Sequence, residues 1–163
     1  MREPKPGEVL LDDPSEMWLR PTFPDALVDR DTIGRQAFRL QKNDNGELSG
    51  ARGSLRTPAE AEEDRLERRR AEGRSLTSAG TWGITVEQLG SIDLQCFDDT
   101  ADPVKLKGPY PPPYAHAIVD LTHLDENAQK NKQFEMAEKA NENGLLTARP
   151  VEAKIESEPS PRA

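Results

Sequence analysis

The chain has 163 residues and a formal net charge of −8, with 34 % hydrophobic and 32 % charged residues. This length and composition predict one domain with a modest core and leave little room for a second domain. The acidic balance argues against nucleic acid as a ligand, because phosphate contacts require a basic field. It favours a protein partner, and in particular one with a basic surface.

Cysteine content and hydropathy bear on the compartment. Cys96 is the only cysteine of the chain, so no internal disulfide can form and no oxidising compartment is implied. No segment approaches the roughly 18 apolar residues that a membrane span needs, and the first residues show no leader pattern. We therefore expect a cytoplasmic protein without membrane association. The glycines at 50 and 53 lack the spacing of a phosphate-binding fingerprint, and we expect no cofactor.

Residues 1–35 are expected to form an irregular, proline-rich arm. Each proline removes a backbone donor and restricts the residue before it, which interrupts any regular period. These prolines stand at positions 4, 6, 14, 21 and 24. Trp18 either pins the arm to the domain surface or anchors a partner, because tryptophan is enriched at interface hot spots.

A β-hairpin is predicted over residues 36–50. Residues 36–41 alternate apolar and polar side chains with the period of a strand. Residues 43–46 read Asn-Asp-Asn-Gly, which is typical of a tight turn because Asn and Gly tolerate positive φ. A short return strand follows at 47–50.

A polar helix is predicted from residue 57 to residue 72. Thr57 and Glu60 fit a capping box, and Pro58 suits the first helical position. The apolar stripe of this helix is thin, which places the helix at the edge of the domain. Arg68 and Arg69 either contact phosphate or an acidic partner, or they pair with the carboxylates of their own helix.

Three apolar runs are the expected core strands. They cover residues 81–86, 92–97 and 115–121, and the last is predicted to be central because its apolar residues are nearly continuous. Cys96 falls on the inward face of the second run. We interpret it as a small core residue rather than a nucleophile, since no basic neighbour lowers its pKa locally.

Two polar segments connect these strands. Three aspartates fall within residues 98–102, and they fit an acidic turn better than a calcium loop, whose glycine and distal glutamate are missing, so we expect no metal site. Residues 109–114 read Pro-Tyr-Pro-Pro-Pro-Tyr, which favours an extended polyproline conformation. Tyr110 and Tyr114 either belong to a stiff, packed connection or contact a partner in the manner of PPxY-type ligands.

The candidates for catalysis are His116, Asp120 and His123, with Ser78 in support. His116 and Asp120 share one face of a strand, but they are roughly 13 Å apart along it, so one ion cannot bridge them. Asp120 and His123 are closer, at a strand-to-helix junction where an acid–base or ligand role is chemically reasonable. The structural alternative is that Asp120 accepts backbone hydrogen bonds and His123 lies on the surface.

A second helix is predicted from about residue 123 to residue 143. Thr122 and Asp125 fit a capping box, and Gly144 suits the end of the helix. The buried face is expected to contain Phe134, Met136, Ala137 and Ala140. Residues 149–163 are rich in Glu, Ser and Pro, and we expect them to be disordered.

The order of these elements predicts an α+β fold. We expect a small mixed β-sheet of three to five strands, packed by one main C-terminal helix and one polar edge helix. The domain is predicted to span residues 36–148, between the irregular arm at 1–35 and the flexible tail at 149–163.

We interpret the chain as a non-catalytic protein-interaction module, such as a small acidic accessory, immunity or antitoxin-like subunit. No complete catalytic constellation is present in the sequence. The expected partner contacts are Trp18, Arg68, Arg69, Tyr110 and Tyr114. The alternative is a small enzyme that acts on a nucleotide or phosphorylated substrate near Asp120 and His123.

Overall fold

The β-forming segments of the chain combine into one antiparallel sheet. The computed structural model describes residues 1–147 and contains six strands within that range. The strands are β1 (Val9–Leu10), β2 (Met17–Thr22), β3 (Glu47–Arg52), β4 (Gly80–Thr85), β5 (Gln95–Asp98) and β6 (His116–Asp120). Their spatial order is β1-β5-β6-β3-β2-β4, and every pairing between them is antiparallel.

The helices are fewer and mostly short. They are α1 (Pro58–Ala71), α2 (Val86–Ser91), α3 (Pro103–Leu106) and α4 (Glu126–Asn143), with single 3₁₀ turns η1 (Pro24–Ala26), η2 (Arg35–Phe38) and η3 (Lys42–Asp44). The predicted α+β class is therefore confirmed. Two details differ, because the sheet has six strands rather than three to five and is antiparallel rather than mixed.

The extra strands come from the segment that was expected to be irregular. Residues 1–35 supply β1 at one edge of the sheet and β2 in its interior, between β3 and β4. Pro21 lies inside β2, opposite Thr81 of β4. A proline is tolerated in a strand where its missing N–H leaves no ladder bond unmade on the paired side.

The predicted hairpin is wrong in its first half. Residues 35–38 and 42–44 form 3₁₀ turns, and β3 pairs with β2 and β6 instead of with residues 36–41. Ala37 and Phe38 are both buried, although neighbouring residues of a strand would point to opposite faces. The predicted turn is present, since Asn45 adopts the left-handed conformation at φ 53°.

The two longer helices follow their sequence signals closely. In α1 the capping box of Thr57 and Glu60 forms as predicted. In α4 the cap is Asp125 rather than Thr122, whose hydroxyl instead donates to Asp120. The expected buried face is present except for Phe134, which is 55 % exposed. The tail predicted at 149–163 lies outside the described residues.

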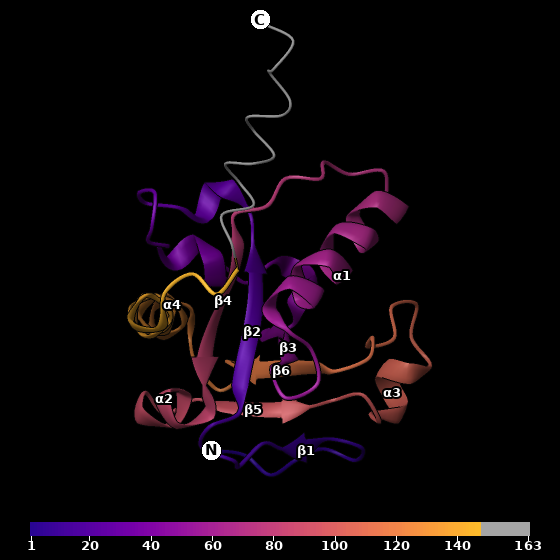
Figure 1. Cartoon of the computed structure of the whole chain (residues 1–163). Coiled ribbons are helices and arrows are strands. Elements are labelled where there is room, and N and C mark those ends of the chain that lie inside the picture. Colours follow the sequence, from indigo (N-terminus) through magenta and orange to yellow (C-terminus); the bar gives the residue numbers. More distant parts are fainter. Residues whose placement is uncertain (148–163) are drawn as a thin grey trace, which may run out of the picture.

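The sheet carries a different helix on each face. Thr81 and Trp82 are successive residues of β4 and point to opposite faces. The Thr81 hydroxyl donates to the carbonyl of Pro58 at the start of α1, whereas Trp82 belongs to the same core as Met136 of α4. In Figure 1, β2 and β4 run up the picture while β5 and β6 run across it, so the sheet is strongly twisted.

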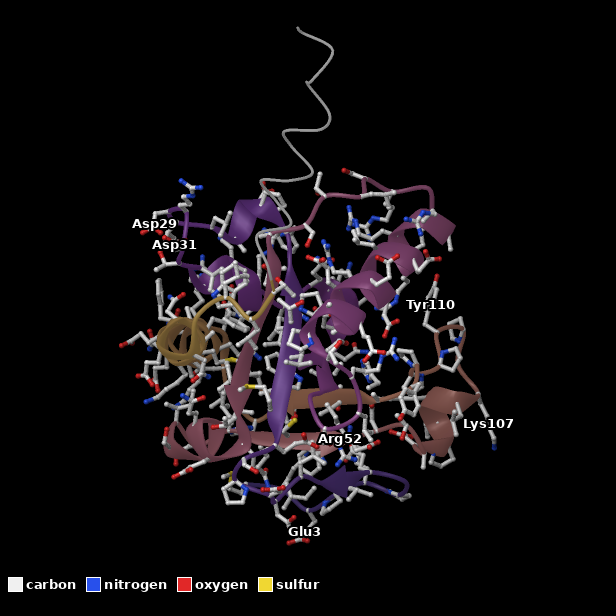
Figure 2. The ribbon with its side chains drawn as sticks, in the orientation of Figure 1. Glu3, Asp29, Asp31, Arg52, Lys107 and Tyr110 are labelled. Carbon is white, nitrogen blue, oxygen red and sulfur yellow. The ribbon has the colours of Figure 1, made fainter. Side chains whose placement is uncertain are left out.

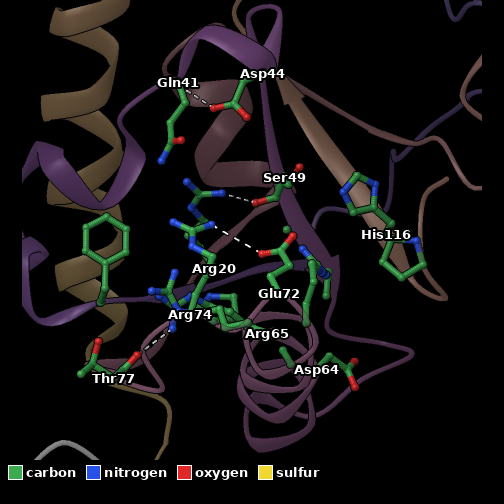
Figure 3. Close-up of a pocket in the computed structure, with 18 of the residues that line it drawn as sticks. Arg20, Gln41, Asp44, Ser49, Asp64, Arg65, Glu72, Arg74, Thr77 and His116 are labelled. Carbon is green, nitrogen blue, oxygen red and sulfur yellow. Dashed lines mark hydrogen bonds and ion pairs between the residues drawn. The ribbon is translucent and has the colours of Figure 1, made fainter. Parts of the chain in front are cut away.

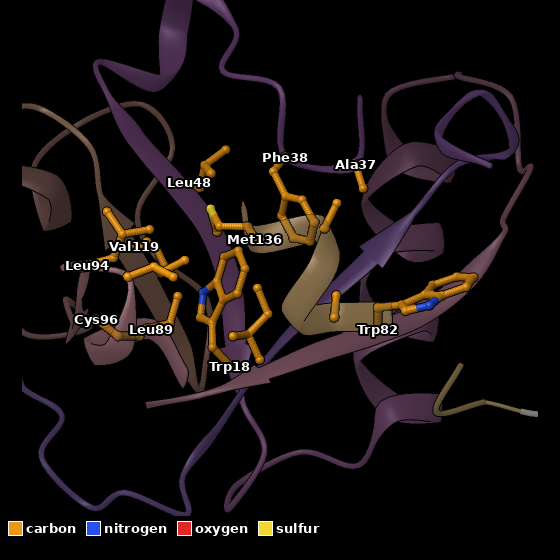
Figure 4. Packing of buried hydrophobic residues seen from close by; sticks show 14 of the residues in the cluster. Trp18, Ala37, Phe38, Leu48, Trp82, Leu89, Leu94, Cys96, Val119 and Met136 are labelled. Carbon is orange, nitrogen blue, oxygen red and sulfur yellow. The ribbon is translucent and has the colours of Figure 1, made fainter. Parts of the chain in front are cut away.

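The main core lies on the α4 side and is organised around Trp18. Its ring centroid is 6.1 Å from that of Phe38, and the two rings pack together with Leu48, Val119 and Met136 (Figure 4). The indole also reaches across β3, where Nε1 donates to the carbonyl of Ala117 on β6 at 3.2 Å.

Gly50 makes this crossing possible. It lies opposite Ala117 in the β3–β6 register, directly beneath the indole. A Cβ atom on Gly50 would come within 2.3 Å of Nε1 of Trp18. The absence of a side chain at this position therefore lets one tryptophan tie together two strands that are not neighbours.

Candidate functional site

A pocket rich in arginine opens between α1, β2 and β3. Its volume is about 700 Å³. We call it the arginine pocket. Its charged and polar lining comprises Arg20, Asp25, Arg39, Gln41, Asp44, Asp64, Arg65, Arg68, Arg69, Glu72, Arg74 and His116, and Phe23, Pro113 and Tyr114 add apolar surface. Figure 3 shows most of these side chains around the space between the helix and the strands.

The pocket exists because β2 separates from β3. The two strands pair only at Trp18–Arg52 and Leu19–Ala51, with a flanking bond from Gly53 N to Met17 O at 2.7 Å. Bonds in an antiparallel ladder recur at every second pair, so the next bonded pair would join Pro21 to Ser49. Pro21 has no N–H to donate, and the ladder ends there.

Arg20 takes over the carbonyl that Pro21 leaves without a donor. Its Nη1 donates to Ser49 O at 2.6 Å (Figure 3). Its Nε donates to Ala37 O at 3.1 Å. Burial lowers the pKa of Arg20, and Asp44 only partly opposes this effect. The guanidinium is thus fixed by backbone carbonyls, and within residues 1–147 it has no carboxylate in ion-pair contact.

The arginines from α1 and its following loop show the same pattern. Arg65 donates to Thr77 O at 3.0 Å, and Arg69 donates to Ser75 O. Burial and repulsion from Arg69, Arg20 and Arg74 lower the pKa of Arg65 to about 10. These guanidinium groups therefore stand close enough to repel one another, and carboxylates do not neutralise them fully.

The acidic residues of the pocket wall are largely engaged elsewhere. Asp64 accepts two hydrogen bonds from Arg56, at 2.9 and 2.6 Å. Asp44 accepts from the backbone N–H of Gln41 at 2.6 Å. Glu72 stands 3.6 Å from Nη1 of Arg74. Among the described residues, this is the one ion pair in which both the carboxylate and the arginine line the pocket. The pocket consequently offers a net positive surface within an acidic chain.

A second set of charges lies beside the outer part of the sheet, around β5 and β6, and we call it the charge network. It comprises Arg2, Lys5, Glu8, Glu47, Asp99, Lys105, His116 and Asp120. Lys105 donates to Asp99 at 2.7 Å and to Glu47 at 2.8 Å. Arg2 donates to Glu8 and Asp120 while its guanidinium lies 4.1 Å from the centre of the Phe97 ring. In this network opposite charges are matched one against another.

Asp120 and His123 are adjacent, as predicted from their spacing. Nδ1 of His123 lies 3.6 Å from the carboxylate of Asp120, which is buried. That carboxylate also accepts from the Thr122 hydroxyl at 2.6 Å and from Nε of Arg2 at 3.2 Å. Burial alone would raise the pKa of Asp120, but the Thr122 hydrogen bonds and the charges of Arg2 and His123 hold it below its usual value.

The other two catalytic candidates bind different partners. His116 donates from Nδ1 to Asp99 at 2.6 Å and lines the arginine pocket. Ser78 is buried beside α1, where its hydroxyl donates to Glu62 at 2.6 Å and accepts from the N–H of Gly80. His116 and Asp120 both belong to the charge network but bind different partners in it, and Ser78 lies apart beside α1, so the four predicted residues do not converge on one site.

The residues predicted to contact a partner also lie in different parts of the molecule. Trp18 is fully buried, so its side chain is a core residue and is not available as an exposed anchor. Arg68 and Arg69 lie on the arginine pocket, as does Tyr114. Cys96 is buried as predicted, and burial raises the pKa of its thiol.

Residues 103–114, which we call the proline–tyrosine segment, are far more exposed than a packed connection would be. Four large side chains of this segment face solvent: Val104 at 79 %, Leu106 at 51 %, Tyr110 at 85 % and Tyr114 at 67 %. Tyr110 and Lys107 both project from the side of the molecule that carries α3 (Figure 2). Of the two alternatives for residues 109–114, the packed connection is therefore wrong, because Tyr110 and Tyr114 are both exposed.

The acidic turn at 98–102 is fully used by the fold. Asp98 accepts from Arg52 at 3.0 Å, Asp99 belongs to the charge network, and Asp102 caps α3 through the N–H groups of Val104 and Lys105. Among residues 1–147, no group of three or more His, Cys, Asp or Glu side chains is arranged to hold a metal ion. Over the same range, no helix is both long enough and apolar enough to cross a bilayer.

Several lining residues of the pocket were not anticipated. Arg20, Arg39, Arg65 and Arg74 are scattered over more than 50 positions, and no local pattern joins them. One signal was available in the sequence, because Arg20 stands between a short apolar run at 17–19 and Pro21. Comparison with models of protein families, with curated proteins and with solved structures found no match.

Proposed function

We propose that the protein is a non-catalytic interaction module that presents its proline–tyrosine segment to a protein partner. The observation that carries this proposal is the exposure of four large apolar or aromatic side chains within eleven residues. Single exposed apolar residues are ordinary on protein surfaces, but a local group of them is characteristic of interaction sites. Tyrosine in particular is enriched among residues that dominate binding energy.

The segment is held in place by the rest of the fold. Asp102 caps α3 at its start, and Lys105 ties the helix to the buried carboxylate of Asp99. Four prolines between positions 109 and 113 restrict the backbone that follows. Binding to a segment that is already ordered costs less conformational entropy, which favours recognition by a partner.

The chemistry of the segment favours a partner with an aromatic-lined groove. Proline-rich strands dock into such grooves because each ring of the ligand packs against an aromatic side chain. The net charge of −8 further favours a partner whose groove has a basic rim.

The test is affinity capture with matched variants of the full chain. Tyr110→Ala and Val104→Asp are expected to abolish retention of the partner, since both side chains are exposed and serve no packing role. Leu76→Ala is the control, because Leu76 is also exposed but lies outside the segment. Partners that are retained equally by all three variants would contradict the proposal.

The enzymatic alternative keeps one supporting observation, which is the contact between Asp120 and His123. An ionised buried carboxylate can orient a histidine for proton transfer. The side chain of His123 is 38 % exposed and so can be reached from solvent. A His123→Gln variant that hydrolyses nucleoside and sugar phosphates as well as the wild-type chain would remove this alternative.

A further inference from the structure

The arginine pocket has the composition of an anion site, because six arginines line it against four carboxylates. Of its arginines, Arg20, Arg65 and Arg69 donate to backbone carbonyls, which compensates hydrogen bonding but leaves the charge in place. In the same chain Arg2, Arg52 and Arg56 all reach carboxylates at 3.2 Å or less. The fold therefore neutralises these three structural arginines with carboxylates, whereas among the pocket arginines only Arg74 has an ion pair within residues 1–147, with Glu72 at 3.6 Å.

Several guanidinium groups of the pocket act on one another. Burial is the main cause that lowers the pKa of Arg65, and repulsion from Arg69, Arg20 and Arg74 lowers it further. Such an arrangement costs free energy in the free protein, and a multivalent anion would recover it. A phosphate monoester carries about −1.5 to −2 charges at neutral pH, so two linked phosphates match this group of arginines better than one.

The size and the walls of the pocket indicate more than a bare diphosphate. Its volume of about 700 Å³ falls inside the range of about 300 to 1,000 Å³ that is usual for small-molecule sites. One part of the rim is formed by Pro113 and by Tyr114, whose ring is 67 % exposed. An exposed aromatic ring beside fixed guanidinium groups suits a planar ring that stacks while its phosphates bind arginine.

A macromolecular anion fits the site less well. The arginines are gathered in a hollow between α1 and the strands rather than along an open stripe. The chain as a whole carries −8, which repels a polyanion at long range. A small ligand with a few charges experiences mainly the local field of the pocket.

We propose that the arginine pocket binds a small organic diphosphate with a planar ring, of the class of nucleoside diphosphates. Arg65, Arg68, Arg69 and Arg74 contact the phosphates, and Tyr114 packs against the ring. Arg20 is held in a fixed position in the site, because its guanidinium already donates to the carbonyls of Ser49 and Ala37. This proposal does not depend on a protein partner for the proline–tyrosine segment.

The test is calorimetric titration of the full chain with ADP, GDP, UDP, pyrophosphate and a poly-glutamate peptide. At least one nucleoside diphosphate is expected to bind more tightly than pyrophosphate and the peptide, and its affinity should fall as salt is raised. The proposal is overturned if none of the diphosphates binds, if pyrophosphate binds as tightly as all of them, or if the peptide binds most tightly.

A matched pair of variants on α1 locates the binding. Arg68→Gln combined with Arg69→Gln is expected to weaken binding by about tenfold or more, because charge-assisted contacts to phosphate are lost. Arg70→Gln is the control, since Arg70 is on the same helix but pairs with Glu67 and does not line the pocket. Circular dichroism establishes that both variants are folded. Equal affinities for the two folded variants would place the ligand elsewhere and overturn the proposal.

Discussion

The arginine pocket and the charge network use the same kinds of side chain in opposite ways. In the network, Lys105 and Arg2 each donate hydrogen bonds to two carboxylates, and Asp99 is completely buried between Lys105 and His116. In the pocket, all hydrogen bonds that Arg20 and Arg65 donate within residues 1–147 go to backbone carbonyls, and Arg65 also lies 5.7 Å from the centre of the Phe23 ring. His116 touches both regions, since it binds Asp99 and lines the pocket.

The difference separates charges that hold the fold from charges that remain available. A buried ion pair is strongly coupled, because removing one partner leaves the other uncompensated in a poorly solvated place. A guanidinium on a carbonyl is hydrogen-bonded but keeps its full attraction for an external anion. Substitutions in the two regions should therefore affect stability very differently.

Removal of Lys105 is expected to have the largest effect. Lys105→Met leaves the buried carboxylate of Asp99 and that of Glu47 without their shared ammonium group. Unfolding by urea should show a loss of about 3 kcal/mol in the free energy of unfolding. Lys107→Met is the control, since Lys107 is exposed and makes no ion pair among the described residues. Equal losses for both variants would show that the network is not structural.

Gly50, which lines the arginine pocket and lies beneath Trp18, gives the next largest effect. In Gly50→Ala the new methyl group would meet Nε1 of Trp18 at 2.3 Å and the carbonyl of Leu19 at 2.6 Å. Overpacking of this kind costs about 2 kcal/mol or more. Because Gly50 also lines the pocket, urea unfolding and ligand titration should both change. A variant of wild-type stability would contradict the close approach of the indole.

Acid should weaken the charge network. Burial opposes ionisation of Asp99, but the hydrogen bonds and charges of His116 and Lys105 outweigh it and hold the pKa below its usual value. Asp120 and Glu8 also have lowered pKa values. The unfolded chain, with carboxyl pKa values of about 4, then takes up protons before the folded chain does.

The contribution of these carboxylates to the free energy of unfolding is consequently at its full value above about pH 5. It is lost as the pH drops through their folded-state pKa values. Each unit by which a carboxyl pKa is depressed is worth about 1.4 kcal/mol. Urea titrations at a series of pH values measure this slope, and Asp99→Asn should flatten it. Stability that rises on acidification would argue against the network as described.

The smallest effect is expected in the pocket. Arg68 is exposed and has no hydrogen bond or ion pair from its side chain within residues 1–147. Arg68→Met should change the free energy of unfolding by no more than about 0.5 kcal/mol, because no internal contact is lost. Urea unfolding measures this change as well. A loss of unfolding free energy comparable to that of Lys105→Met would contradict the difference between the two regions.

Local signals predicted the parts of the fold that depend on neighbouring residues. The cap at Thr57, the strand at 80–85 and the strand at 116–120 all follow from patterns within about eight positions. Residues 36–38 were misread because Phe38 packs on Trp18, a contact between distant segments that overrides local alternation. Pro21 was expected to interrupt regular structure, but it lies inside β2, because its missing N–H is not needed for pairing with β4.

The candidate surfaces were predictable only in part. Arg68, Arg69, Tyr110 and Tyr114 were singled out because they lie in short, unusual runs. Arg20 and Arg39 reach the same pocket from other segments, and only the folded arrangement reveals that they meet there. The burial of Trp18 was equally hidden, since it depends on a glycine 32 positions away.

The proline in β2 also has a mechanical consequence. Beyond Leu19 the pair of β2 and β4 is joined to the larger part of the sheet mainly by side chains, through Arg20 to Ser49 and Trp18 to Ala117. The ladder between β3 and β6, by contrast, runs through five residue pairs. Partial unfolding should therefore begin where β2 separates from β3, which we call the seam. Amide hydrogens next to the seam should exchange before those of β6, and a ligand held between the two parts would close it.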